Sequence, residues 1–411
     1  MATQVRAEKW IKSSPAQVYY ALTHAAELVE WMCDFATVAP RPRGRLYLWW
    51  HGDFYSTGEF ISLEENKSVV FQWHARLDPC STEVAVTLEE KEGGTVVTLT
   101  QTLPEGSYWV ENAPRFQQEW EATLDNLAQM LETGLDKRVF DRPMIGINIS
   151  DFNADIARAL GVPVKTGIRL DFLPEEMSAY KAGLRKDDVL VSLGGHPITN
   201  DFDSLLSALQ GTKVGDKLEA VFYRSPEKQS VLVELGKRPA PEIPWDAATL
   251  SKIVRAKYDD GLAALEAAFA GVNEAEADFA PAAGEWSAKE TLAHLIHNER
   301  HWLENLDDVI GGYPRTADDW GGNSSIHARA TVAAYKTIRG LLDEMKRLAD
   351  EMVSYTAALP ESFISHKAAY FLSVNMLLEG SLPHIRSHLD QIQKAIAAAR
   401  ETKTHLMVNL S

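Results

Sequence analysis

The 411-residue chain lacks the features that would place it in several specialised classes of protein. It has two cysteines, Cys33 and Cys80, and no CxxC pair, which is too few for a disulfide framework and fits a reducing compartment. No run of about 18 apolar residues occurs, so we expect no membrane span. The first residues also lack the apolar centre of a signal peptide. We therefore expect a cytoplasmic protein.

Basic residues are outnumbered as well. The sequence holds 41 Lys and Arg against 58 Asp and Glu, a formal net charge of -17, and it has no Lys/Arg-rich run. Nucleic acids and anionic membranes require basic patches, so we expect neither as the main partner. With 45% hydrophobic and 24% charged residues, the composition is that of globular domains, and the length suggests two to four of them.

Two proline-bearing junctions divide the chain. The first covers residues 136–143, where a long helical pattern has ended at Gly134 and strand-like sequence resumes. The second, at residues 239–244, has three prolines and is expected to be extended and semi-rigid. We therefore expect a multidomain α+β protein with domains at residues 1–138, 141–238 and 245–400.

The first domain alternates apolar and polar residues over several short segments. They cover residues 4–11, 45–50, 56–63, 69–74, 82–88 and 95–101 and are expected to be strands. Ser14 and Pro15 begin a short helix, and residues 114–131 repeat apolar side chains at helical spacing. This order predicts a curved antiparallel sheet that grips one long helix.

Residues 14–19, 58–60, 94–100 and 120–131 resemble the START-like (SRPBCC) superfamily, in particular the branch of chaperone-ATPase-activator homologues. The resemblance implies a helix-grip fold with a cavity for a small apolar molecule between sheet and helix. Aromatic side chains on these elements are the expected lining: Trp31, Tyr47, Trp49, Phe71, Trp73, Phe116 and Trp120. The alternative is that these rings fill a solid core.

The middle domain carries Ala-Gly-Leu at 182–184, Asp-Val-Leu at 188–190 and a turn at Gly195. These residues resemble a PDZ domain, a small barrel or sandwich, of the type appended to HtrA-like proteases; Asp187 stands where that family usually has glycine. The resemblance implies that a C-terminal peptide of another protein adds as a strand. The expected contacts are Met144, Ile145, Gly146 and Ile147 in the carboxylate loop, with Phe202, Leu205 and Leu209 opposite.

Two alternatives stay open for this domain. Leu205 and Leu209, four residues apart on one helix, could face the groove or the core. The domain could also be a spacer with an empty or occluded groove. No Gly-Asn-Ser-Gly-Gly segment accompanies it, so we expect no serine protease activity.

The third domain has four periodic helical segments, at 247–270, 287–310, 328–348 and 367–399, which predict an up-down four-helix bundle. His384 and His388 are four residues apart and share one helix face, while His294 lies on the second segment. If these helices are neighbours, the three imidazoles can converge on one ion and leave a position open. Spacing alone favours unrelated surface histidines.

The Trp-Ser-x-Lys-Glu-x-Leu-x-His-Leu pattern at 286–295 and the His-x-x-x-His-x-x-Gln pattern at 384–391 resemble the DinB/YfiT-like metal-binding bundles. The resemblance implies a divalent metal on His294, His384 and His388. Zinc or nickel is expected, because neutral imidazoles suit borderline metals. Pro383 is a departure from that family: with Gly380 it should kink or start the helix there, so His384 could point differently from its counterparts in the family.

Three functions are consistent with these domains. One is a ligand-binding protein with an apolar START-like pocket, a PDZ peptide groove and a metal site of three histidines. Another is a metal-dependent thiol transferase or hydrolase that acts on small electrophiles, with the first two domains as sensor or targeting modules. The third is an interaction scaffold with degenerate sites. The sequence leaves catalysis open.

Overall fold

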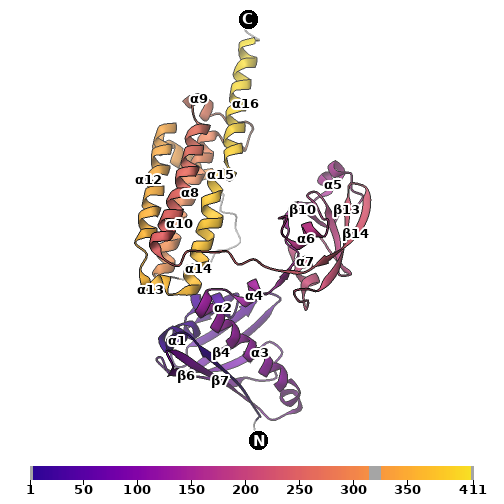
Figure 1. Ribbon diagram of the computed structural model, residues 1–411, viewed down its shortest axis with the longest axis vertical. Coiled ribbons are helices and arrows are strands. Elements are labelled where there is room, and N and C mark those ends of the chain that lie inside the picture. Colours follow the sequence, from indigo (N-terminus) through magenta and orange to yellow (C-terminus); the bar gives the residue numbers. More distant parts are fainter. Residues whose placement is uncertain (1–2, 314–324, 409–411) are drawn as a thin grey trace. The chain divides into compact units, whose positions relative to one another are not determined.

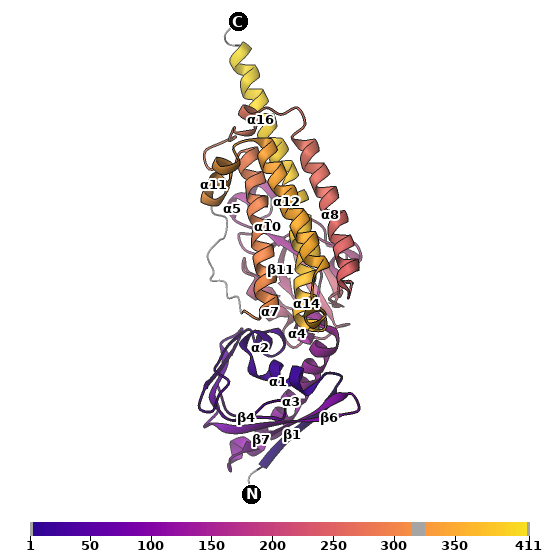
Figure 2. The same ribbon diagram turned by 90° about the vertical axis from the view of Figure 1, so that its left-hand side faces the viewer.

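The computed structural model describes residues 3–313 and 325–408, shown in Figures 1 and 2. The expected bundle at 245–400 therefore includes residues 314–324, which lie outside the described part. By its internal contacts the chain divides into two compact units, Met1–Gly134 with Pro241–Ser411, and Leu135–Ala240. Within the described ranges, no helix has both the length and the apolarity to cross a membrane.

A seven-stranded antiparallel sheet forms the N-terminal domain, with the order β1-β7-β6-β5-β4-β3-β2. Successive strands from β2 to β7 are neighbours, and β1 pairs with β7, so the sheet is a meander with one long-range pairing. The strands are β1 Thr3–Ile11, β2 Phe35–Val38, β3 Arg45–Trp50, β4 Phe54–Glu64, β5 Ser68–Ala75, β6 Thr82–Lys91 and β7 Gly94–Leu103.

Three helices complete this domain: α1 (Pro15–Thr23), α2 (Ala25–Trp31) and α3 (Ser107–Thr133). Ser14 and Gln17 form a capping box at the start of α1. Helix α3 lies against one face of the sheet and buries its apolar side there (Figure 2). It ends at Gly134, which has a φ of 77°. A Cβ at that position would lie 2.4 Å from the carbonyl oxygen of Lys367, so only glycine permits this approach.

The middle unit has a sheet with the order β14-β13-β11-β10-β9, and the short strand β12 pairs with β11. A separate pair joins β15 to β8. The elements of this unit are α4 Lys137–Phe140, β8 Pro143–Met144, β9 Asn148–Ser150, α5 Ala154–Leu160, β10 Ile168–Phe172, α6 Ser178–Lys181, β11 Val189–Leu193, β12 His196–Pro197, α7 Phe202–Leu209, β13 Lys217–Arg224, β14 Glu227–Glu234 and β15 Gly236–Lys237.

The aspartate that stands in place of the usual glycine, Asp187, lies in the turn before β11. Asp187 has a φ of 68°, a left-handed conformation that glycine adopts without strain and aspartate tolerates. Its carboxylate accepts a hydrogen bond of 2.8 Å from Arg169 Nε. The next residue, Asp188, is fully buried and accepts from Arg224 Nε at 2.8 Å and from the Arg185 amide at 2.7 Å. These ion pairs thus stabilise the turn, although aspartate stands there instead of the usual glycine.

Long helices build the C-terminal domain: α8 (Ala247–Ala268), α10 (Ala288–Ile310) and α12 (Ile338–Ala357) run side by side with a final interrupted helix (Figures 1 and 2). That helix consists of α14 Lys367–Asn375, the π-helical segment Met376–Ser381, α15 Leu382–Ser387 and α16 Leu389–Val408. Shorter helices are α9 Glu274–Ala277, α11 Ser325–Tyr335 and α13 Glu361–Ile364. The fold is thus mixed α and β with a helical C-terminal region, as predicted.

Two of the expected bundle helices are interrupted. The segment expected as one helix at 328–348 is α11 and α12, separated at Lys336, which has a φ of 63°. Thr337 then caps α12 by accepting from the Gly340 amide at 3.0 Å. The segment expected at 367–399 passes through the π-helical stretch and a turn at His388. Both interruptions bear on the position of the candidate site.

Candidate metal centre

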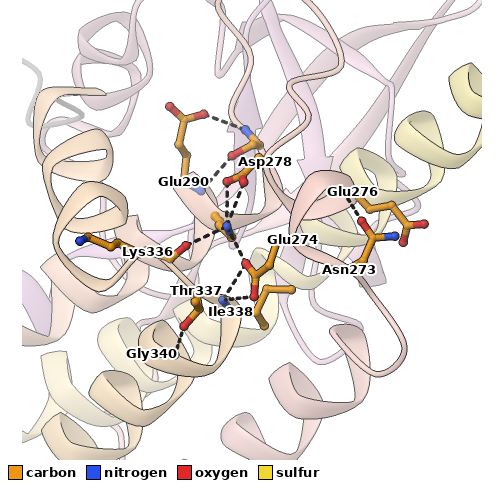
Figure 3. Close-up of polar contacts among 11 residues, drawn as sticks. Asn273, Glu274, Glu276, Asp278, Glu290, Lys336, Thr337, Ile338 and Gly340 are labelled. Atoms are coloured by element: carbon orange, nitrogen blue, oxygen red, sulfur yellow. Dashed lines mark hydrogen bonds and ion pairs between the residues drawn. The ribbon is translucent and has the colours of Figure 1, made fainter.

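The start of α10 is firmly anchored, and it positions His294. Ser287 and Glu290 form the expected capping box, with bonds of 3.2 Å and 2.9 Å. Lys289 is buried and pairs with Glu274 at 2.6 Å and Asp278 at 3.0 Å, in the network shown in Figure 3. Its ammonium also donates to the Lys336 carbonyl at 3.0 Å. These contacts fix the first turn, and His294 follows about two turns from the helix start.

The segment around Pro383 positions the other two histidines. Proline has no amide hydrogen and its ring crowds the preceding helical turn. The π-helical segment Met376–Ser381 ends two residues before Pro383. Such wider turns accommodate an irregularity and are frequent at functional sites. Pro383 left the direction of His384 open, and in the structure its ring centroid lies 5.1 Å from that of His294. The π-helical turn therefore absorbs the kink without separating these rings.

Three imidazoles from α10, α15 and the turn after α15 converge. Each of His294, His384 and His388 offers one nitrogen, and these atoms all lie within 4.8 Å of one another. The remaining ring centroids are 5.0 Å apart for His294 and His388 and 4.6 Å apart for His384 and His388. The two Nε2 atoms of His384 and His388 lie 2.8 Å apart. The structure thus brings together the complete triad named from the sequence.

Hydrogen bonding sets the roles of the ring nitrogens. His388 Nδ1 lies 2.8 Å from Gln391 Oε1. Because an amide oxygen only accepts, Nδ1 carries the hydrogen and Nε2 keeps its lone pair toward the cluster. His384 Nδ1 is buried and has no hydrogen-bond partner within the described residues. The cluster is therefore incompletely satisfied as it stands.

Burial and mutual repulsion keep the imidazoles of His294 and His384 neutral. Burial, reinforced by His384, His388 and His297, lowers the pKa of His294 to about 4. Burial and then His388 lower the pKa of His384. Neutral imidazole is the form that ligates metals, so these two residues are ready to bind at neutral pH. A set of three nitrogen donors fits zinc or nickel.

Other histidines on α10 lie outside this triad. His297 stacks on His327 with a centroid separation of 4.1 Å, and His301 is exposed. In the core of this domain, the hydroxyl of buried Tyr258 donates to the buried carboxylate of Glu299. Burial, followed by the charge of Glu299, raises the pKa of Tyr258 well above its ordinary value. This pair is a satisfied core contact between α8 and α10.

Five of the seven aromatic residues named for the N-terminal cavity share one core cluster: Trp31, Phe71, Trp73, Phe116 and Trp120. The rings of Trp73 and Trp120 are 5.1 Å apart. Trp120 Nε1 donates to Gln101 Oε1 at 2.8 Å, and Trp31 Nε1 donates to the Ala21 carbonyl at 3.0 Å. Their polar atoms are therefore satisfied within the core, as in closely packed aromatic clusters.

Tyr47 and Trp49 lie on the opposite face of the sheet. The core cluster receives Leu46 and Leu48 from β3, and side chains alternate along a strand. Tyr47 instead stacks near Tyr55, a residue 39% exposed. The strand phase thus places the smaller aliphatic residues inward and these two rings outward, which corrects the face expected for them.

Of the residues named for peptide binding in the middle unit, some are buried in its core and others are exposed. Gly146 has a φ of 76°, and Ile145 is buried in the core of the middle unit. Met144 pairs with Gly236 in the short β8–β15 ladder, while Ile147 is partly buried. On α7, Leu205 and Leu209 pack into the core, whereas Phe202 is 50% exposed. The two leucines are thus buried in the core of this unit.

Comparison with known families assigns the two ends of the chain. Residues 12–132 match the family model described as activator of Hsp90 ATPase homolog 1-like protein, and residues 257–392 match that of the DinB superfamily. The chain carries an Hsp90-activator-like START domain and a DinB domain. All three clustered histidines lie within the DinB match.

Similar curated proteins include the periplasmic serine endoprotease DegP (32% identity over 108 residues) and the periplasmic pH-dependent serine endoprotease DegQ (34% over 110 residues), both of Escherichia coli K12. Each alignment covers 26% of this chain, and 22% and 23% of those proteins respectively. The chain therefore matches less than a quarter of their length.

Similar solved structures include the Aha1 dimer from Colwellia psychrerythraea, with 23% identity, 32% of this chain and 96% of that chain covered, and a TM-score of 0.29. Another is the protein MLL2253 from Mesorhizobium loti, with 22% identity, 32% and 97% coverage and a TM-score of 0.29.

Proposed function

We propose that this chain is a multidomain ligand-binding protein whose DinB domain binds one divalent metal ion through His294, His384 and His388. The observation that carries the proposal is the convergence of three ligand nitrogens within 4.8 Å, in surroundings that keep His294 and His384 neutral. Zinc or nickel suits this donor set.

The residues of the site would each have a distinct part. The three histidines hold the ion, and Gln391 orients the His388 ring through its Nδ1 hydrogen. A bound metal of this kind lowers the pKa of a coordinated thiol or water. Three protein ligands leave a coordination position for such a molecule, which also suits the thiol transferase or hydrolase alternative.

The test is metal analysis of full-length protein purified without chelator or polyhistidine tag. We expect zinc or nickel in wild type, and the His388→Ala variant should hold one equivalent less. His301→Ala is the matched control, because His301 lies on α10 but is exposed and outside the triad. Undiminished metal in His388→Ala, with the same fold by circular dichroism, would contradict the proposal.

For the middle unit we propose the binding of a C-terminal peptide beside β9. Strand β9 is the end strand of its sheet order, and the left-handed Gly146 lies just before it. An end strand can accept an added strand, and Phe202 provides an exposed apolar side chain on α7. Fluorescent peptides with a free carboxylate should bind more tightly than their amidated forms; equal affinity would contradict this mode.

For the START domain we propose a small apolar ligand between the sheet and α3. The clustered rings of Trp73 and Trp120 would form its walls. An apolar fluorophore should bind wild type and respond to Trp120→Ala, but not to Trp10→Ala, because Trp10 is 42% exposed. Absence of dye binding would favour the solid core.

The free cysteines Cys33 and Cys80 support a cytoplasmic location, and the net charge of -17 supports a protein that does not bind nucleic acid.

A further inference from the structure

A second cluster of ligand-type side chains lies where α2 of the START domain meets the start of α14 in the DinB domain. Glu27 and Glu30 are three residues apart on α2, so both project from one helix face. His366 immediately precedes α14, 339 residues after Glu27. One ligand atom from each of the three side chains lies within 4.8 Å of the other two. Folding alone brings these residues together.

The cluster is held by packed backbone rather than by mobile side chains alone. Ala368, two residues after His366, belongs to the hydrophobic core of the START domain. Gly134 at the end of α3 allows the Lys367 carbonyl to approach so closely that a Cβ there would clash. His366 therefore faces α2 from a position whose next two residues are closely packed against the START domain.

The geometry within the cluster is uneven. His366 Nε2 lies 2.8 Å from Glu27 Oε2, which is hydrogen-bond distance. The same nitrogen is 3.7 Å from Glu30 Oε2, which is too far for a hydrogen bond. The side chains of Glu27, Glu30 and His366 are 7%, 16% and 29% exposed. Glu30 is thus a largely buried carboxyl that faces an imidazole without bonding to it.

Charge in the cluster is unbalanced. Two largely buried carboxyls share one imidazole, so full ionisation would leave a net negative charge away from water. Burial, followed by the Glu27 charge, raises the pKa of Glu30 to about 8, against the smaller lowering effect of His366. Tyr20 borders the same group, and its pKa is raised by burial and then by Glu27 and Glu30. As ligands, both carboxyls would be ionised and the imidazole neutral, and a divalent cation would balance the two carboxylate charges.

We propose that Glu27, Glu30 and His366 form a second divalent-metal site, which joins the START domain to the DinB domain. Two carboxylate oxygens and one imidazole nitrogen suit Mn²⁺, Fe²⁺ or Zn²⁺ better than Mg²⁺ or Ca²⁺, which prefer oxygen ligands alone. An ion here would bridge elements from the two domains, so its binding would favour the packed arrangement of α2 and α14.

The experiment uses full-length protein and Zn²⁺ alone, in equilibrium dialysis after removal of all metal. Four proteins separate the two sites: wild type, His388→Ala, Glu30→Gln and the double variant. Glu30→Gln has nearly the shape of a protonated carboxyl but cannot supply a carboxylate ligand, so it tests ligation with little disturbance of packing. Glu361→Gln is the control, because Glu361 is an exposed acid on α13 near His366.

We expect wild type and Glu361→Gln to bind two Zn²⁺ ions, each single variant one, and the double variant none above background. In His388→Ala, adding Glu30→Gln should weaken the remaining binding at least about 10-fold. Wild type that binds one ion, together with His388→Ala that binds none, would overturn the second site and leave the histidine site standing. Equal binding by wild type and His388→Ala, with loss in Glu30→Gln, would overturn the histidine site instead.

Discussion

In each of the two clusters the ligand atoms lie within 4.8 Å of one another, but the electrostatics of the clusters are opposite. In the histidine cluster, burial and mutual repulsion lower the pKa of His294 to about 4 and also lower that of His384, so these two imidazoles resist protonation. At the other cluster, burial is the largest single effect on His366 and lowers its pKa. The hydrogen bond to Glu27 and the negative charges of both glutamates together outweigh burial, so the pKa of His366 is raised. The first cluster therefore offers lone pairs without a counter-charge, whereas the second already contains an ion pair.

Glu344 shows what a buried glutamate does when cations are sufficient. It accepts 2.8 Å from Arg347 Nε and 2.7 Å from Arg300 Nη2. The hydrogen bond from Arg347 is the main reason that the pKa of Glu344 falls to about 2, whereas that of Glu30 rises to about 8. The comparison teaches that burial alone does not decide the state of a carboxyl here. The number of facing cations does.

The largest expected effect is metal-dependent stability at the histidine cluster. In the Glu30→Gln background, which isolates that cluster, Zn²⁺ at a hundredfold excess over its Kd should raise the free energy of unfolding by about 2.7 kcal/mol, because it binds only the folded domain. Thermal unfolding with and without Zn²⁺ measures this. Adding His388→Ala should remove the gain, and a gain that survives would place the ion elsewhere.

A smaller effect should follow from Glu344→Gln. A pKa lowered from 4.5 to about 2 contributes stability above pH 4.5, which is lost as the pH falls toward 2. Because the side chain of Arg347 is 57% exposed, we discount the full shift and expect a loss of about 2 kcal/mol at pH 7. Urea unfolding at pH 7 and pH 3 checks this, and the difference should shrink at pH 3.

The control for that change is Glu351→Gln. Glu351 also pairs with Arg347, at 2.9 Å, but its side chain is 53% exposed, so its loss should cost well under 1 kcal/mol. Equal losses from the two substitutions would mean that burial does not strengthen the Glu344 pairs, and the contrast with Glu30 would then fail.

Local patterns in the sequence predicted the sheet, the capping box and the histidine triad. Strand alternation and helical spacing are short-range signals, and the triad also followed from the resemblance to DinB bundles. It was harder to predict which β3 side chains face the core, because Leu46 and Tyr47 are both apolar enough to do so. The break between α11 and α12 at Lys336 was not predicted, because it depends on a left-handed φ that a lysine in the sequence does not indicate.

The second cluster had no signal in the sequence. Glu27 and Glu30 look like solvent-facing acids of a short helix, and His366 is 339 residues from Glu27. Their meeting depends on Gly134 and Ala368, which let α14 pack against the START domain. Such long-range convergence comes from tertiary packing, so only the folded structure reveals it.

Gln391 offers a finer test of the histidine cluster. Its Oε1 accepts from His388 Nδ1, which fixes the ring for ligation through Nε2. Gln391→Ala should weaken Zn²⁺ binding about 10-fold, the lower end of the usual range, because the contact is exposed. Isothermal titration in the Glu30→Gln background measures this. Gln393→Ala, exposed on the same helix, should leave the affinity unchanged; an equal loss there would indicate a general effect on α16.

The smallest expected effect is that of Glu30→Gln on metal-free protein. A carboxyl whose pKa rises from 4.5 to about 8 on folding favours the folded state fully below pH 4.5, and that contribution is lost as the pH rises toward 8. Glutamine does not titrate, so the variant should be more stable than wild type at pH 7. We expect a gain on the order of 1 kcal/mol, reduced by solvent screening because the Glu30 side chain is 16% exposed. Unfolding in chelator at pH 7 and pH 4 measures it, and the gain should vanish at pH 4, where Glu30 is protonated in the folded state and largely so in the unfolded one. A loss of stability at pH 7 would instead show that the Glu30 carboxylate is ionised and well compensated, like that of Glu344.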